Sequence, residues 1–318
     1  MIYKKMILFA SGRTDIIAFY SDWLMNRIRE GFVDVRNPYE KTQVTRYQIN
    51  AACADTLVFC TKNPAPILPY IEELLHTRIP LYFFVTITPY GKGIEPNVPD
   101  KNTVITDFIK LSEAVGSQNV CWRYDPVFID KTYTADYHKD AFDRMGKALY
   151  NATDRCVISF IDLYKKTMKN FPGIREVTQD EQKELALSFA ESAARNKISV
   201  ETCAEKLDLS AYGVERGGCV SRGIIERTCG RRIMQKIPGN SQHLRNLCDC
   251  LPTRDIGAYN SCPHMCRYCY ANYDAESVRR NHARHNPRSS FLIGGAQETD
   301  KIHVAEQQLW CELTPELF

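Results

Sequence analysis

The sequence lacks both a long hydrophobic run and a strong charge of one sign. No apolar stretch approaches the roughly 20 residues that span a bilayer. The apolar residues 6–10, behind the basic start, are too few for the core of a signal peptide. The 41 Lys and Arg nearly balance the 38 Asp and Glu, so the net charge of +3 makes no general case for a nucleic-acid or membrane partner. We therefore expect a cytoplasmic protein that does not bind membranes.

Length and composition also exclude a disordered or fibrous chain. The 318 residues are 44% apolar and 25% charged, both close to the averages for globular proteins. A sizeable hydrophobic core is therefore expected. The length fits one large α/β domain or two ordinary ones.

Short apolar runs alternate with segments of helical period over the first 200 residues. Such runs are typical of buried parallel strands, and they occupy residues 6–10, 56–60, 81–87, 119–123, 155–161 and 197–202. Apolar helix faces lie between them at residues 67–75, 104–115, 142–149 and 185–193, and Gly116 is a helix-stop signal. Repeated strand–helix units predict an α/β fold with a parallel sheet. Six units favour a full or partial β/α (TIM-like) barrel, with a doubly wound open sheet as the alternative.

The character of the chain changes near residue 200. Strand–helix alternation fades, while Gly, Pro, Cys and Arg become more frequent. One further strand-like run covers residues 255–259. We therefore divide the chain into a β/α barrel core at 1–200 and a cysteine-rich region at 201–318.

Cysteine is the most unusual feature of the composition. The chain has 13, and eight of them fall between residues 203 and 269. In a cytosolic chain of this length such a density indicates metal binding or catalysis rather than disulfides. Cys60, Cys121 and Cys156 lie within predicted strands, where a buried thiol behaves as a small hydrophobe.

The densest cluster has the spacing C-x3-C-x2-C, formed by Cys262, Cys266 and Cys269. Three thiolates on one loop can hold three irons of a [4Fe–4S] cube and leave the fourth iron open. Electron carriers of the ferredoxin type supply four cysteines and close the site. An open iron can bind a small molecule through an amine and a carboxylate. A zinc site completed by a distant ligand is the alternative for these cysteines.

This motif, with Tyr268 directly before the last cysteine, resembles the radical S-adenosylmethionine (SAM) superfamily. The run Cys-Pro-His-x-Cys-x-Tyr-Cys-Tyr-Ala is most similar to its spore-photoproduct-lyase-like branch. The resemblance implies a radical SAM enzyme with a SAM-binding [4Fe–4S] cluster, in which the three cysteines are catalytic. It also implies a reductant such as flavodoxin or ferredoxin.

Polar residues at the ends of predicted strands extend the resemblance. Thr61-Lys62-Asn63-Pro64 is similar to an element that meets the SAM amino group in that branch, and Arg123-Tyr124-Asp125-Pro126 is similar to its later arginine motif. The whole chain, including Arg13-Thr14-Asp15-Ile16, resembles an uncharacterised radical-SAM-like family. The residues that the resemblance implies as cofactor contacts are Tyr268, Thr61, Lys62, Asn63, Arg123, Asp125, Ser159, Arg13 and Asp15. For Arg13 and Asp15, a structural ion pair that caps the following helix is the alternative.

The position of the cysteine loop departs from the family pattern. In ordinary radical SAM enzymes the loop follows the first barrel strand, whereas here it follows six strand-like segments. A circular permutation would reconcile the two, with residues 255–259 closing the barrel from the C-terminal side. Alternatively, residues 6–10 are the true first strand and the loop folds over the barrel mouth from outside.

A second set of cysteines precedes the loop: Cys203, Cys219, Cys248 and Cys250. Four thiolates would fully ligate an auxiliary [4Fe–4S] cluster, and zinc fits the same set. Cys229 is a spare that could replace one of the four.

The sequence does not identify the substrate of the predicted enzyme. The resemblance to photoproduct-lyase-like proteins raises nucleic acid or a nucleotide as a candidate, although a fold-level analogy is a weak basis for function. The alternative function is a zinc- or iron–sulfur-stabilised nucleic-acid-binding module without catalysis. Its contact surface would be the basic run at residues 279–288.

Overall fold

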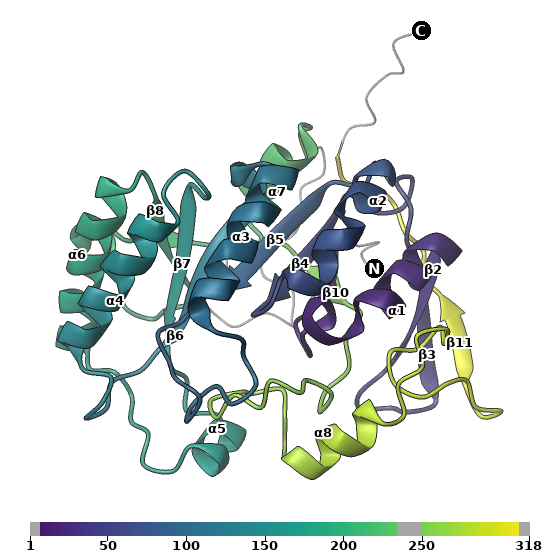
Figure 1. The fold of residues 1–318 in the computed structure, drawn as a ribbon. Helices are drawn as coiled ribbons and strands as arrows, with labels where there is room; N and C mark the ends of the chain where they lie inside the picture. The colour runs from purple at the N-terminus through teal and green to yellow at the C-terminus, as the bar shows by residue number, and fades with distance from the viewer. Residues whose placement is uncertain (1–6, 234–249, 312–318) are drawn as a thin grey trace, which may run out of the picture.

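A single parallel sheet organises the molecule, and it includes strands from both ends of the chain. The computed structural model describes residues 7–233 and 250–311 (Figure 1). The sheet has eight parallel strands in the order β10-β1-β4-β5-β6-β7-β8-β9. Their bounds are β1 (Ile7–Ala10), β4 (Thr56–Thr61), β5 (Leu81–Thr86), β6 (Val120–Val127), β7 (Arg155–Phe160), β8 (Ser199–Cys203), β9 (Glu215–Gly217) and β10 (Thr253–Asp255). The predicted α/β class is confirmed.

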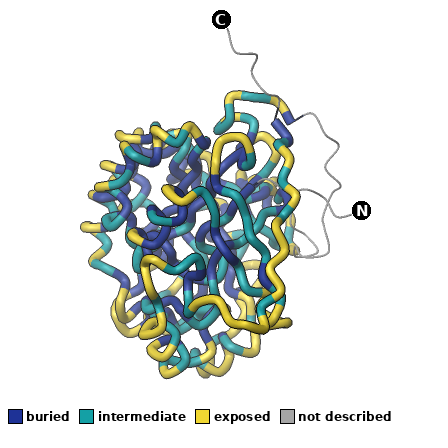
Figure 2. Tube along the Cα trace, turned by 90° about the vertical axis from the view of Figure 1, so that its right-hand side faces the viewer, coloured by how far each residue is buried: buried dark blue, intermediate teal, exposed yellow. Residues whose placement is uncertain are grey.

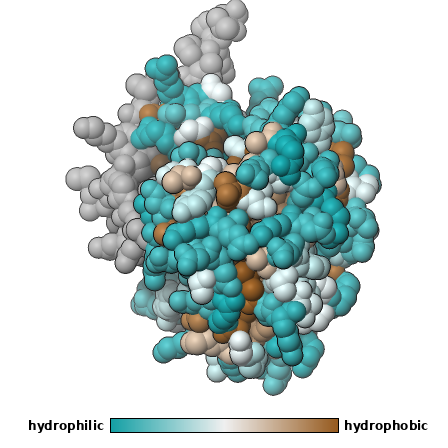
Figure 3. Space-filling view, turned by 90° about the vertical axis from the view of Figure 1, so that its left-hand side faces the viewer, coloured by the Kyte–Doolittle hydropathy of each residue, from teal (hydrophilic) through white to brown (hydrophobic). Residues whose placement is uncertain are grey.

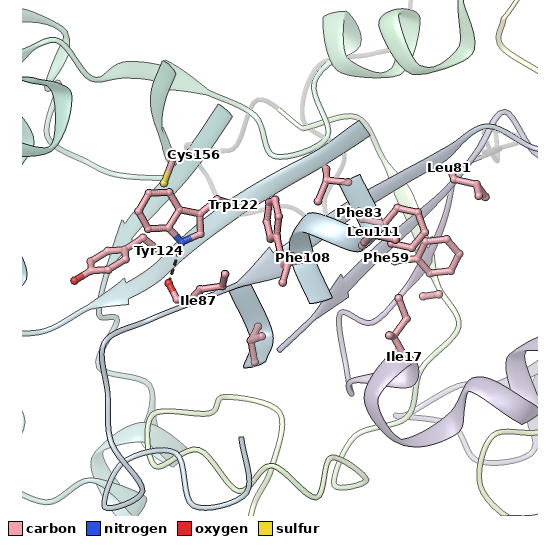
Figure 4. Close-up of a cluster of buried hydrophobic side chains, with 14 of the residues drawn as sticks. Ile17, Phe59, Leu81, Phe83, Ile87, Phe108, Leu111, Trp122, Tyr124 and Cys156 are labelled. Carbon is pink, nitrogen blue, oxygen red and sulfur yellow. Dashed lines mark hydrogen bonds between the residues drawn. The ribbon is translucent and has the colours of Figure 1, made fainter. Parts of the chain in front are cut away.

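Helices cover one face of this sheet. Residues of α1, α2, α3, α4 and α6 share one hydrophobic core with alternate residues of the strands. Figure 4 shows part of it, where Trp122 of β6 packs beside Tyr124 and donates its indole N–H to the Ile87 carbonyl at 3.0 Å. The helix bounds are α1 (Ile16–Glu30), α2 (Ile71–His76), α3 (Lys101–Val115), α4 (Ala135–Ala148), α5 (Lys165–Asn170), α6 (Gln179–Arg195), α7 (Arg222–Cys229) and α8 (Ala275–His282).

The outer sides of these helices face solvent. Figure 2 shows buried residues concentrated in the interior and exposed ones at the periphery. Figure 3 shows the side that bears α4 and α6 as mainly hydrophilic, because their large apolar residues, such as Phe142 and Phe189, are turned inward. The helical periodicity of the apolar residues therefore predicts the buried helix faces, with the exception of Leu75, which is exposed.

The opposite face of the sheet carries a second core. Val58 of β4, Phe84 of β5 and Val157 of β7 pack there with Ile224 and Ile225 of α7. Several cysteines, including Cys203, Cys219 and Cys250, pack against the same cluster. The residues after position 200 thus add strands to the sheet and also cover one of its faces.

Each predicted strand has a counterpart in the sheet, whereas β9 was not predicted. β6 extends to Val127, past the predicted end at residue 123, so Arg123 and Asp125 lie within the strand. The run predicted at residues 255–259 overlaps β10 (Thr253–Asp255) only at Asp255. The strand ends there because the Asp255 carboxylate turns back to accept the Gly257 N–H at 2.7 Å. Gly12 allows this turn, since a Cβ at that position would lie 2.2 Å from the Asp255 Oδ2. The helix stop predicted at Gly116 is confirmed, with φ of +88°.

A small second sheet was not predicted. It has the order β11-β3-β2, with bounds β2 (Phe32–Arg36), β3 (Gln43–Gln48) and β11 (Lys301–Val304). The residues of β11 are all exposed, and β3 is largely only half-buried. Strands with so little buried surface leave no run of apolar residues in the sequence, which explains why they were missed.

Candidate functional site

A cavity of about 410 Å³ opens where the parallel strands end. Its volume lies in the range of small-molecule sites, about 300–1,000 Å³. Of the predicted site residues, the lining includes the three loop cysteines, Tyr268, Thr61, Lys62, Arg123, Asp125, Ser159, Arg13, Asp15 and Cys203. The structure thus brings together residues that lie as much as 256 positions apart, from Arg13 to Cys269.

The cysteine loop is fixed over the cavity by hydrogen bonds from three directions. Asn272 donates to the Cys262 carbonyl at 2.8 Å, and the Ala271 N–H lies 3.4 Å from the Cys269 Sγ. Tyr20 of α1 donates to the Ser261 carbonyl at 2.5 Å. Burial raises the pKa of all three thiols, that of Cys266 to about 12. Bound metal would supply the positive charge that these buried sulfurs need in order to ionise.

Asp15 anchors the loop rather than pointing at open space in the cavity. Its Oδ1 caps α1 by accepting the Ala18 N–H at 2.9 Å. Its Oδ2 accepts the Lys62 N–H at 2.8 Å and lies 2.9 Å from the Nε2 of His264, inside the cysteine loop. One carboxylate therefore joins the ends of β1 and β4 to the C-x3-C-x2-C loop. The helix cap considered for Asp15 is therefore present, but the ion pair expected with it is not, because Arg13 pairs with Asp255 instead.

We expect Asp15→Asn to lower the free energy of unfolding by about 1–3 kcal/mol, measured by urea unfolding. The amide keeps an oxygen for the cap, but its NH₂ can accept a hydrogen bond from neither the Lys62 N–H nor the His264 ring. Buried groups left unpaired in this way carry a cost of that size. Asp274→Asn is the matched control, because Asp274 also caps a helix but its described bond is only to the Ser277 N–H. Asparagine caps as well as aspartate, so the control should change little. Equal losses in the two variants would contradict the anchoring role.

Glu95 is the centre of a buried polar cluster that sequence reasoning missed. Its carboxylate accepts from the Lys62 Nζ and the Thr88 hydroxyl, both at 2.8 Å, and also pairs with Lys101. The Tyr268 hydroxyl donates to the same oxygen as Lys62. Glu95 is almost fully buried. Burial acts to raise the pKa of Glu95, but Lys62 and Lys101 outweigh it and lower that pKa to about 2.

The loop that carries Glu95 also holds the cysteine loop in place. Asn97 donates to the Pro263 carbonyl at 2.7 Å, and the Ile94 carbonyl accepts the Arg267 N–H at 3.0 Å. Glu95 stands in a connection rich in Gly and Pro after β5, without a recognisable motif. Only its tertiary contacts reveal the role.

The Thr-Lys-Asn element forms a tight turn at the end of β4. The Thr61 hydroxyl bonds the backbone of Asn63 in both directions, at 3.0 and 2.9 Å, and the Asn63 side chain accepts the Ala65 N–H at 3.3 Å. Thr61 and Lys62 line the cavity, whereas Asn63 is outside its lining. Asn63 therefore shapes the turn that positions Lys62.

A second polar group lies deeper, around Arg123. Its guanidinium pairs with Asp125 and lies 3.5 Å from the Cys60 Sγ, while Ser159 donates to Asp125. The Nε of Arg123 is buried without a hydrogen-bond partner. A buried donor left in this way can donate a hydrogen bond to a ligand in the cavity. At the cavity rim, Arg13 pairs with Asp255 at 3.8 Å and lies over the Tyr259 ring.

Three cysteines of the predicted second set also meet. The Sγ atoms of Cys203, Cys219 and Cys250 all lie within 4.8 Å of one another. Cys248 lies outside the described residues. Cys229 is not near this group, because its thiol donates to the Asp55 carbonyl at 3.1 Å and interacts with Cys311.

The basic run at residues 279–288 extends from α8 and is attached to α1. Trp23 and Asn26 of α1 donate to the carbonyls of Ser289 and Pro287, at 2.9 and 3.0 Å. Arg279, Arg280 and Arg284 are exposed. In the part of the chain that the structure describes, no helix is both long and apolar enough to cross a membrane.

Comparison with known protein families identifies the family of the chain. The model of a family described as a domain of unknown function (DUF1848) matches residues 7–271, from β1 through the cysteine loop. No curated protein matches the chain. The matched region ends directly after the last loop cysteine and includes every cavity residue discussed above.

Proposed function

The chain belongs to the DUF1848 family, and we propose that it is a radical SAM enzyme of the spore-photoproduct-lyase-like type. The observation that carries the proposal is that Cys262, Cys266 and Cys269 line one cavity together with Lys62 and Arg123. A C-x3-C-x2-C loop alone would also suit a metal-stabilised binding module. A binding module has no need for a cavity of this size lined by charged groups.

The topology supports a permuted partial barrel. β10 pairs in parallel with β1, Phe9 opposite Asp255, and the cysteine loop follows β10 directly. β9 and β10 are the two edge strands of the sheet. The segment after β9 nevertheless contacts the segment before β10, because the Leu251 N–H donates to the Val220 carbonyl at 2.8 Å. The loop thus follows the strand next to β1, although that strand is the last of the eight-stranded sheet in chain order. This arrangement is compatible with the circular permutation expected from the sequence and supports that part of the proposal.

The donor set fits the cluster that the proposal requires. Three sulfurs from one loop would hold a [4Fe–4S] cluster with one open iron, and the Ala271 N–H beside the Cys269 sulfur is the type of contact that tunes such clusters. Once bound and reduced, the cluster would supply the electron that cleaves SAM to methionine and a 5′-deoxyadenosyl radical. The protein contributes orientation and the exclusion of competing reactions.

The polar residues of the cavity have distinct roles in this proposal. Glu95 holds Tyr268 and Lys62 in place, so that both present fixed groups beside the loop. Asp125, which pairs with Arg123 and accepts from the Ser159 hydroxyl, holds the guanidinium in place, and the unpaired Arg123 Nε offers a hydrogen-bond donor to the carboxylate or ribose of SAM. A guanidinium suits such oxygens because its donors form a rigid planar fork.

The proposal is tested by anaerobic purification followed by assay of SAM cleavage. We expect brown protein with about four irons per chain at the loop, and formation of 5′-deoxyadenosine when a chemical reductant or reduced flavodoxin is added. Stoichiometric zinc at these cysteines, with no iron after reconstitution, would refute the proposal and favour the nucleic-acid-binding module. A panel of nucleotides, nucleic acids and peptides, followed for deuterium transfer to 5′-deoxyadenosine, would identify the substrate class.

We expect Arg123→Lys to weaken SAM binding by about 1–3 kcal/mol while iron content stays unchanged. Lysine keeps the charge but loses the planar fork, and bonds to charged groups contribute about this much. The measurement is equilibrium dialysis with labelled SAM. Arg29→Lys is the control, since Arg29 lies on the surface and pairs with Glu73. Unchanged SAM affinity in the Arg123 variant would remove Arg123 from the binding site.

A further inference from the structure

The three sulfurs of Cys203, Cys219 and Cys250 converge from separate segments of the chain. Cys203 ends β8, Cys219 follows β9, and Cys250 precedes β10. The Val220 N–H lies 3.4 Å from the Cys250 Sγ, the kind of outer contact that supports a metal-bound thiolate. Ordinary core cysteines such as Cys156 instead pack singly among apolar residues.

The spacing of these sulfurs fits a single metal ion. Around tetrahedral zinc, with Zn–S bonds of about 2.3 Å, two sulfurs lie about 3.8 Å apart. In a cubic cluster each thiolate binds a different iron, so the sulfurs diverge further. The Sγ atoms of Cys203, Cys219 and Cys250 lie within 4.8 Å of one another, whereas among the described residues those of the cysteine loop form no such close set. The two cysteine groups therefore differ in the metal chemistry they suit.

This triad reaches the same cavity as the cysteine loop. Cys203 and the next residue, Ala204, both line it. Ala204 has φ of +57°, a left-handed conformation that is uncommon for a residue with a Cβ. Among the described residues the group offers three protein ligands. With its fourth position open to the cavity, such a site would have the coordination of catalytic rather than structural zinc.

Two buried arginines flank the triad. Arg123 interacts electrostatically with Cys203 and Cys219 and lines the cavity. Arg155 donates to the Gly218 carbonyl at 3.0 Å, next to Cys219, and pairs with Glu201 at 2.5 Å. Three thiolates and a divalent ion carry a net charge of −1. The nearby guanidinium of Arg123 would offset the further negative charge of an anionic ligand.

We propose that Cys203, Cys219 and Cys250 bind one zinc-like divalent ion whose fourth position, in the cavity, takes a thiol group of the substrate as thiolate. A soft, thiolate-rich ion selects a soft donor atom. The thiol releases its proton to solvent when it binds, and no electron is transferred. This inference goes beyond the proposed SAM chemistry, since metal and thiol binding need no SAM cleavage.

The test uses the full chain with Cys262, Cys266 and Cys269 replaced by alanine, so that only the second group binds metal. We expect one Co²⁺ per chain with the absorption of a tetrahedral thiolate site. Adding 2-mercaptoethanol should raise the sulfur-to-cobalt charge-transfer intensity by about one third, as three thiolate ligands become four. Cys250→Ser in the same background should lose the site, whereas Cys229→Ser, the matched control outside the triad, should keep it.

Three outcomes would overturn the proposal. A brown iron–sulfur chromophore that depends on Cys250 would mean a second cluster. The site would be a closed four-cysteine site if the protein that retains Cys248 did not respond to 2-mercaptoethanol and Cys248→Ser lowered the charge-transfer intensity by about one quarter. Absence of Co²⁺ binding would leave the triad as core packing.

A second measurement guards against misfolding of the triple variant. Zinc and iron are counted by plasma emission in otherwise unchanged protein, with Cys250→Ser compared with Cys229→Ser. One zinc lost only in the Cys250 variant, with the iron of the loop retained, supports the proposal. Equal zinc in both variants contradicts it. Since neither measurement uses SAM, failure of the radical SAM proposal would remain distinguishable from failure of this one.

Discussion

Replacing Cys266 with alanine should abolish SAM cleavage, with a loss well beyond the 10- to 100-fold typical of residues that only support a metal ligand. Cys266 is buried, lines the cavity and would hold one corner of the cluster. With two thiolates left on the loop, the cluster would lose a protein ligand that nothing nearby in the loop replaces. The measurements are 5′-deoxyadenosine formation and iron content after anaerobic reconstitution.

The control for this experiment is Cys53→Ala, a half-buried cysteine outside the cavity lining. It should keep both iron and activity. Formation of 5′-deoxyadenosine by the Cys266 variant at the rate of the control would show that the loop is not the catalytic centre.

Glu95→Gln should lower the free energy of unfolding by about 3–5 kcal/mol, the range expected when one partner of a buried ion pair is removed. The variant leaves Lys62 and Lys101 charged in the interior without their carboxylate. The Tyr268 hydroxyl would also lose its anionic acceptor beside the cysteine loop. The measurement is urea unfolding at pH 7, compared with the unchanged protein.

The same carboxylate predicts a pH dependence. The pKa of Glu95 falls from an ordinary 4.5 to about 2 in the folded protein. A lowered pKa means that the folded state binds the proton less readily than the unfolded state. The Glu95 carboxylate therefore stabilises the folded protein fully above pH about 4.5, and this stabilisation is lost as the pH falls toward 2. The shift corresponds to about 3 kcal/mol. The difference in the free energy of unfolding between the unchanged protein and Glu95→Gln should therefore decrease below pH about 4.5.

Glu73→Gln provides the matched control for this prediction. Glu73 also pairs with a basic residue, Arg29 at 2.6 Å, but both side chains are more than 40% exposed. Exposed pairs contribute about 0–1 kcal/mol. If Glu95→Gln lowered the free energy of unfolding as little as Glu73→Gln does, the view that the buried cluster organises the site would be contradicted.

The parallel strands and the site-bearing segments were predictable because their signals are local. Runs such as 81–87 are apolar over consecutive residues, and burial on both faces of a parallel sheet requires that pattern. Likewise, the C-x3-C-x2-C spacing confines three candidate ligands to one loop, so this loop can be recognised in the sequence without knowledge of the fold. The polar residues at the end of β4 and within β6 also lie in short local motifs, and Thr61, Lys62 and Arg123 do line the cavity.

Contacts between distant residues required the tertiary structure. Nothing near Glu95 in the sequence indicates that it holds Lys62 and Tyr268, and the bond between Asp15 and His264 joins residues 249 positions apart. The convergence of Cys203, Cys219 and Cys250 depends on how β8, β9 and β10 are placed around one face of the sheet. The sequence by itself determined the buried strands, the outer helix faces and the ligand loop, since each follows from neighbouring residues. Only the fold decided which charges are paired and which cysteines share a site, because burial and pairing depend on segments far apart in the chain.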